Sequence, residues 1–215
     1  METNWAAEHL QVIRTLMERS AVYRRALAPV MTLTGALGMT AALVGWLARI
    51  DSPRGFTIYW LLVSLAAVAG ALVLVRREAL KEGEPFWSPP TRRVTQALLP
   101  PLTAGLILSV MILLESGSTE SALLNEMALM VRLPAAWIIL YGCALHAAGF
   151  FMPRGMKMFG WSFVLGGCGL FALGVPEGLR PIYLYAHGMM GLFFGALHLA
   201  YGIYLYFTEQ RKNSA

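Results

Sequence analysis

The chain has 215 residues, of which 57% are apolar and only 13% are charged, and its mean hydropathy is +0.59. These values lie outside the usual range of soluble globular domains and indicate that most of the chain is solvated by lipid. Six crossings of about 20 residues each would use more than half of the chain, which excludes a separate large soluble domain beside them. The formal net charge is +5, so the positions of the cations become informative about orientation.

The N-terminal segment, residues 1–25, carries charges throughout and lacks the uninterrupted apolar core of a cleaved signal peptide. Its apolar residues recur with helical spacing opposite the charged ones; they are Leu10, Ile13, Leu16 and Met17. This pattern predicts an amphipathic helix on the cytoplasmic membrane surface. The alternative is a docking helix for a cytosolic partner.

Six apolar runs follow, each bounded by charges, proline or glycine, and each long enough to cross a bilayer. The predicted spans are Ala26–Ala48, Phe56–Val75, Gln96–Leu114, Leu133–Met152, Met156–Val175 and Ile182–Phe207. We therefore expect an all-α integral membrane protein with a six-transmembrane-helix bundle over residues 26–207 and a cytoplasmic tail over 208–215.

The orientation follows from the lysines and arginines that flank these runs. Thirteen fall in the N-terminal segment, the 76–93 loop, the 154–157 turn and the C-terminal tail, and four fall on the opposite side. Because cytoplasmic flanks carry the excess of cations, both termini are predicted to be cytoplasmic. The composition favours a bacterial cytoplasmic (inner) membrane as the location.

Two connecting segments have patterns of their own. In the 76–93 loop, mixed charges predict that the second helix continues past the membrane until prolines end it. Phe86 and Trp87 lie among those prolines and form either a partner-docking knob or plain lipid anchors. On the outer side, residues 123–130 predict a short amphipathic helix that ends before Pro134 and lies along the leaflet.

The predicted spans contain no Asp, Glu, Lys or Arg away from their ends. Pumps and ion-coupled transporters usually place their chemistry on intramembrane charges, so a carboxylate-based carrier is disfavoured. Cys143 and Cys168 lie in apolar runs without a disulfide or zinc spacing. A site made of Cys143 and His146, which are three residues apart, is geometrically allowed but unlike structural zinc sites.

The sixth span has the most regular pattern in the chain. His187, Gly191, Gly195, His198 and Gly202 fall within about 80° of arc at 100° per residue. Tyr183 and Tyr201 flank this face, which makes it a candidate ligand-binding or cavity-lining surface. The simpler interpretation is a close helix crossing at the Gly191/Gly195 pair, with histidines that form hydrogen bonds across it.

A second interpretation of the histidines is a b-type haem, which needs imidazoles from facing helices and small residues beside the macrocycle. His146 and His198 are predicted at similar depth near the inner ends of their spans, so they are the candidate haem ligands. His187 lies near the outer end, where no second histidine is expected. The sequence therefore allows one such haem and not two.

These patterns lead to three functional hypotheses. The leading one is a non-enzymatic scaffold, sensor or accessory subunit that presents a basic cytosolic face to membrane lipid, a cytosolic protein partner or another copy of itself. The runner-up is a small transporter or pore for a neutral or hydrophobic compound, and the third is a redox subunit with one b-type haem or a quinone site. No motif for nucleotide or nucleic-acid binding is found in the sequence.

Overall fold

The computed structural model describes residues 26–81, 83, 85–114, 122–152, 154–174 and 181–213. Within these ranges the regular secondary structure is entirely helical. The predicted amphipathic helix over residues 1–25 lies outside the described residues, as does the end of the C-terminal tail.

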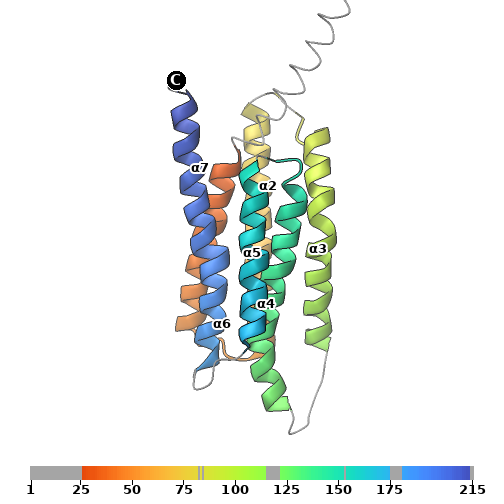
Figure 1. Cartoon of the computed structure of the whole chain (residues 1–215), viewed down its shortest axis with the longest axis vertical. Coiled ribbons are helices and arrows are strands. Elements are labelled where there is room, and N and C mark those ends of the chain that lie inside the picture. The colour runs from red at the N-terminus through yellow and green to blue at the C-terminus, as the bar shows by residue number, and fades with distance from the viewer. Residues whose placement is uncertain are drawn as a thin grey trace, which may run out of the picture.

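Six helices are long and apolar enough to cross a membrane, which confirms that part of the fold prediction (Figure 1). The first span is Ala26–Leu47, and it is followed by α2 (Pro53–Lys81), α3 (Pro89–Leu114), α4 (Ala122–Ala148) and α5 (Arg154–Leu173). The sixth span is divided into α6 (Ile182–Met190), the π-helical segment η1 (Gly191–Leu197) and α7 (His198–Asn213).

The six spans run up and down in one elongated bundle, so Ala26 and Asn213 lie at the same end (Figure 1). We name this end the inner end and the opposite one the outer end, after the orientation that the flanking charges predict. An even number of crossings places both ends of the described chain on one side of a membrane.

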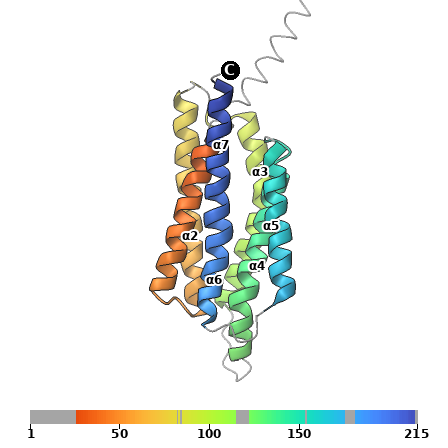
Figure 2. The same cartoon turned by 60° about the vertical axis from the view of Figure 1, so that its left-hand side comes forward.

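Helix α4 lies at the centre of the bundle, with α3, α5 and α6 packed around it, while the first span packs beside the sixth (Figures 1 and 2). Half of the apolar stretch of α4 is buried, against only 6% of the corresponding stretches of α2 and α3. The leucines and valines on α2 and α3 therefore face outward, which suits side chains whose solvent is lipid.

The connection between α2 and α3 agrees with the sequence prediction in part, because α2 continues into the charged segment but ends before the first proline, Pro85. Helix α2 continues to Lys81, where the ammonium forms an ion pair with Glu78 at 3.0 Å. Pro89 and Pro90 are the first residues of α3; just before them, the Ser88 hydroxyl lies 2.9 Å from the Thr91 hydroxyl, and the Ser88 carbonyl accepts the Arg92 N–H. These bonds begin α3 directly after the chain reverses.

The prediction of a separate helix along the outer leaflet before Pro134 is wrong. Helix α4 is continuous from Ala122 to Ala148 and contains Pro134, whose side chain is fully buried. A proline removes one helical hydrogen bond, but ending the helix inside a bilayer would leave several more unpaired. The helix therefore continues through it.

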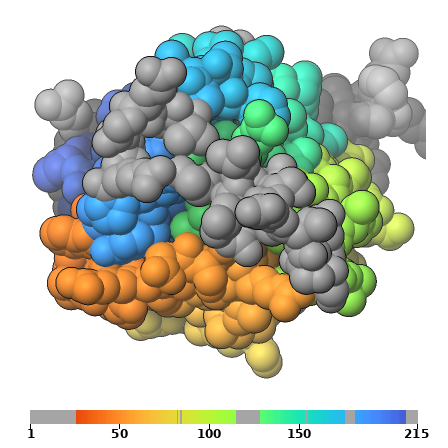
Figure 3. All heavy atoms as spheres, turned by 90° about the horizontal axis from the view of Figure 1, so that it is seen from below, coloured from red at the N-terminus to blue at the C-terminus, as the bar shows by residue number. Residues whose placement is uncertain are grey.

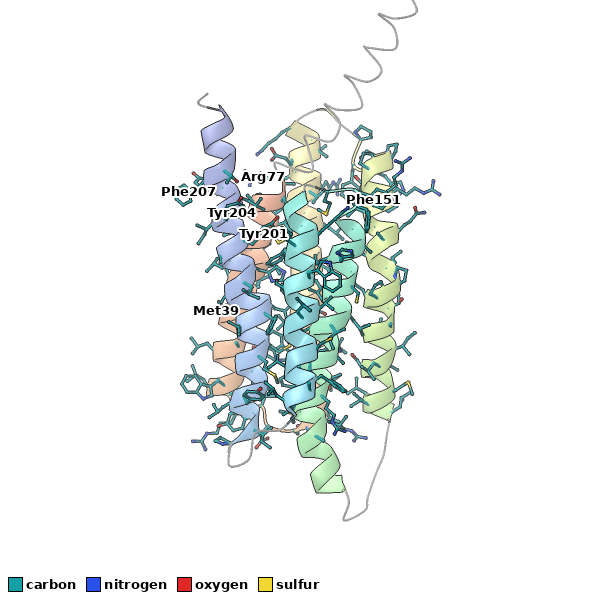
Figure 4. All side chains as sticks on the ribbon, in the orientation of Figure 1. Met39, Arg77, Phe151, Tyr201, Tyr204 and Phe207 are labelled. Atoms are coloured by element: carbon teal, nitrogen blue, oxygen red, sulfur yellow. The ribbon has the colours of Figure 1, made fainter. Side chains whose placement is uncertain are left out.

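Glycines form the contact between the first and sixth spans. A Cβ added at Gly38 would collide with the Phe194 carbonyl, and one added at Gly195 would lie 2.8 Å from the backbone nitrogen of Met39, which Figure 4 labels beside the sixth span. The same exclusion holds along the crossing, at Gly35 against Leu199, Gly191 against Ala42 and Gly202 against Thr32. The glycine face of the sixth span thus packs against protein, at backbone distance.

A second close contact joins α4 and α5. A Cβ added at Gly142 would lie 2.8 Å from the Gly160 carbonyl oxygen, and one added at Gly160 would lie 2.6 Å from the backbone nitrogen of His146. The first crossing holds the sixth span against the first span, and the second holds α5 against α4. Aromatic side chains pack between α4, α5 and the sixth span.

Candidate functional site

The π-helical segment separates the two histidines of the sixth span. Its seven residues, Gly191–Leu197, lie between His187 in α6 and His198 at the start of α7. Wider helical turns of this kind are rare and are often found at functional sites. Here the segment coincides with the glycine contact against the first span.

His187 uses both of its ring nitrogens in hydrogen bonds to other parts of the chain. Its Nε2 lies 3.1 Å from the carbonyl oxygen of Ile50, in the turn that follows the first span. Because a carbonyl only accepts, Nε2 carries the proton, and Nδ1 accepts the indole N–H of Trp60 on α2 at 3.2 Å. His187, which is 1% exposed, therefore joins α6 to α2 and to the turn that follows the first span.

Aromatic side chains surround His187 and form what we call the outer histidine cluster: Phe56, Tyr59, Trp60, Trp137 and His187. The Phe56 and Tyr59 rings lie 5.0 and 5.9 Å from the imidazole, and Phe56 stacks on Trp137 at 6.1 Å. Seen from the outer end, the first span and the beginning of α2 lie alongside the sixth span (Figure 3). Three indole or phenol groups thus converge at this end.

Hydrogen bonds extend this cluster to the other helices. The Tyr59 hydroxyl donates to the Ala41 carbonyl at 2.6 Å, and the Trp137 indole donates to the Ser109 hydroxyl on α3 at 3.1 Å. A Cβ at Gly45 would collide with the His187 ring, so the glycine is needed for the imidazole to reach the turn. The outer end is therefore tied together by directional bonds as well as by packing.

His198 is bonded on both sides in the same way. Its Nδ1 lies 2.9 Å from the carbonyl oxygen of Phe193 in η1 and therefore carries the proton. Its Nε2 accepts the hydroxyl of Tyr141 on α4 at 2.8 Å. The bond to Tyr141 links the sixth span to the central helix α4. His198 is fully buried.

Aromatic rings also enclose His198, from α5 and from η1. Phe159 and Phe163 meet the imidazole edge-on, each at 5.2 Å between ring centres, and Phe194 stacks on it at 6.1 Å. With Tyr141 and His198 these residues form the inner histidine cluster. Tyr201 borders it, stacked on Phe159 at 4.4 Å (Figure 4).

His146 does not share this site. Five residues along α4 turn it about 140° away from Tyr141, and its ring meets Phe150 at 5.5 Å and Trp161 at 5.4 Å on the outside of α5. Its Nδ1 lies 3.5 Å from the Lys157 carbonyl oxygen. Among the described residues, we find no contact between the rings of His146 and His198, the pair that the sequence suggested as haem ligands.

The other residues singled out in the sequence have separate environments. Tyr183 is partly buried and packs against the apolar cluster that contains Phe56 and Trp60. Phe86 and Trp87 form a ring pair at 6.4 Å on the α2–α3 connection. Cys143 and Cys168 are exposed on the outside of the bundle. Across the described part of the chain, no three His, Cys, Asp or Glu side chains are grouped so as to hold a metal ion.

The partners of the two buried histidines were missed from the sequence. Neither Trp60 nor Tyr141 was predicted to pair with a histidine, although a phenol in the middle of an apolar span needs a hydrogen-bond partner. That requirement was the available signal. With both nitrogens occupied and one proton on each ring, the two imidazoles serve as cross-links, and an iron atom would have to displace Tyr141 from His198.

Comparison with other proteins adds no family assignment. The chain matches no protein-family model, and neither the curated proteins nor the solved structures contain a significant match. The functional argument therefore rests on the geometry of the bundle alone.

Proposed function

We propose that this chain is a non-enzymatic multi-pass membrane protein that acts as a scaffold or accessory subunit. The observation that carries the proposal is that both ring nitrogens of His187 and of His198 form hydrogen bonds within the protein. One bond of each ring joins the sixth span to another helix, through Trp60 on α2 and Tyr141 on α4. These imidazoles are the interior groups best suited to chemistry, and they are committed to holding the bundle together. The protein resides in a bacterial cytoplasmic membrane with both termini in the cytoplasm.

The rest of the interior supports a rigid body. Buried hydroxyls are paired within the protein: Thr57 donates to the Pro53 carbonyl at 2.7 Å and Ser109 donates to the Gly105 carbonyl at 2.7 Å. Fully satisfied polar groups and backbone contacts at glycines favour one fixed packing. Such a bundle is suited to presenting its ends to other molecules.

The surface we assign to a partner is the inner end of the α2–α3 hairpin. Trp87 is 59% exposed there, beside the prolines and near Arg92 at the start of α3. Exposed tryptophan with arginine is a frequent composition of protein interfaces. The partner is therefore a cytosolic or membrane-bound protein with an acidic rim, or a second copy of the chain.

A photo-crosslinking amino acid placed at Trp87 tests this assignment in cells. The matched control position is Trp46, which has a similar exposure of 48% at the outer end. The proposal expects a discrete protein adduct from Trp87 that Trp46 does not give and that Arg92→Glu abolishes. Equal labelling from both positions, or labelling of lipid alone, would reject the hairpin as the docking surface.

A second function, transport of a neutral or hydrophobic compound, is favoured by the π-helical segment in the sixth span. A shift of Gly191–Leu197 between π and α geometry would slide α7 along the first span. Solute flux into vesicles that contain the protein, lost on Gly195→Leu with retained fold, would support transport in place of scaffolding. A Soret band in the purified protein would instead favour the redox hypothesis.

A further inference from the structure

A third cluster of polar and aromatic side chains lies on the outside of the bundle, where α4 turns into α5 at the inner end. It consists of His146, Phe150, Lys157 and Trp161, which we call the turn cluster. The rings of Phe150 and Trp161 each meet the edge of His146, and the Lys157 ammonium lies 3.7 Å from the centre of the Phe150 ring. The four side chains therefore form one continuous contact.

Lys157 is held in this position by packing. A Cβ added at Gly149 would lie 2.7 Å from the Lys157 Cγ, so the aliphatic stem occupies the space over that glycine. The attraction between the ammonium and the face of Phe150 fixes the other end of the side chain. The cation is therefore placed before any ligand arrives, unlike a lysine that extends freely into solvent.

Two donors of the turn cluster have no protein acceptor among the described residues. The indole N–H of Trp161, a side chain that is 49% exposed, has none, and the Lys157 ammonium makes only the ring contact. Both groups are donors only. A negatively charged acceptor from outside the protein could therefore bind both donors at once.

Apolar surface surrounds these donors. Phe150 is 64% exposed, Phe151 48% and Met158 77%, and Figure 4 labels Phe151 near the inner end of the bundle. Aromatic rings and lysine at the end of a span are typical of the headgroup level of a bilayer. A ligand at this place needs an anionic part for Lys157 and Trp161 and an apolar part for the rings, which a phospholipid has and a free anion lacks.

We propose that the turn cluster is a binding site for an anionic phospholipid, with Lys157 and Trp161 as donors to the headgroup phosphate and Phe150 and Phe151 against the upper acyl chains. The site is independent of the buried histidines and of the α2–α3 hairpin. It anchors the α4–α5 turn at one depth in the inner leaflet.

Native mass spectrometry of the full chain, purified in detergent and titrated with phosphatidylglycerol, tests the site. Lys157→Gln should reduce lipid retention about fivefold, the effect expected for one lysine near an anionic headgroup. Lys81→Gln is the control, because it removes the same charge from the inner end of α2, where the ammonium is already paired with Glu78. An equal loss in both variants would show that net charge decides retention and would overturn the proposal.

Further variants separate the contributions of the site and guard against misfolding. Trp161→Phe keeps the ring and removes the N–H, and should reduce retention about threefold, whereas Lys157→Arg should retain the lipid. Unchanged retention in Trp161→Phe and Lys157→Gln would overturn the site. Excess inorganic phosphate should not displace the lipid, and displacement by phosphate would show that the site binds a free anion.

Discussion

The close contact between the first and sixth spans gives the sharpest test of the packing. Gly38→Ala places a methyl group against the Phe194 carbonyl and 2.7 Å from the backbone nitrogen of Gly195. Bringing both atoms to an ordinary contact of 3.4 Å requires the two backbones to separate by about 1.1 Å, because the Phe194 carbonyl oxygen is the nearer of the two. Neither atom belongs to a flexible side chain, so the strain cannot be relieved by a rotamer change, and overpacking of this kind costs about 1–3 kcal/mol.

The matched control is Gly188→Ala, in α6 of the sixth span, where an added Cβ meets nothing within 4 Å. Replacing a helical glycine by alanine gains about 0.8–1.0 kcal/mol of helix propensity. Because both variants share this gain, the difference between them measures the steric cost alone. We expect Gly38→Ala to be less stable than Gly188→Ala by about 1–3 kcal/mol.

Unfolding in mixed micelles of a mild detergent and dodecyl sulfate, followed by circular dichroism, measures this difference. The midpoint for Gly38→Ala should fall at a lower fraction of dodecyl sulfate than that for Gly188→Ala. Equal midpoints would refute the reasoning, because they would mean that the first and sixth spans do not meet at backbone distance. The double variant Gly38→Ala with Gly195→Ala should be destabilised further, since both strain the same crossing.

The remaining predictions concern the two histidines and the topology. Trp60→Phe leaves the buried Nδ1 of His187 without its donor and should lower the free energy of unfolding by about 1–3 kcal/mol in the same assay; an unchanged midpoint would show that the Trp60 bond contributes nothing. Tyr141→Phe removes the donor to His198 Nε2 and should also lower the free energy of unfolding by about 1–3 kcal/mol. Full stability of this variant would mean that water or another group replaces the hydroxyl. Accessibility tags at Thr3 and at residues 214–215 should both be cytoplasmic, and a tag within residues 115–121 should be on the opposite side; a terminus outside would reject the proposed orientation.

The differences between prediction and structure have specific causes. Pro134 was interpreted as a boundary because proline usually ends helices in water, but in a bilayer the unpaired backbone of a broken helix costs more than one lost hydrogen bond. His146 was placed with His198 because their distances from the inner ends of their spans agree. Depth, however, does not give the direction in which a side chain points, and α5 offers His146 the Trp161 ring on its outer face.

The sequence by itself determined the six apolar spans, the continuation of α2 into its charged end and the glycine face of the sixth span, because length, hydropathy and helical periodicity are properties of each segment alone. Only the tertiary structure decided what that face meets and what the histidines bind. The partners of His187 and His198 on other helices, Trp60 and Tyr141, are 127 and 57 residues away in the chain. No pattern within a span specifies such a partner, because the choice depends on which helices become neighbours and how each is rotated about its axis.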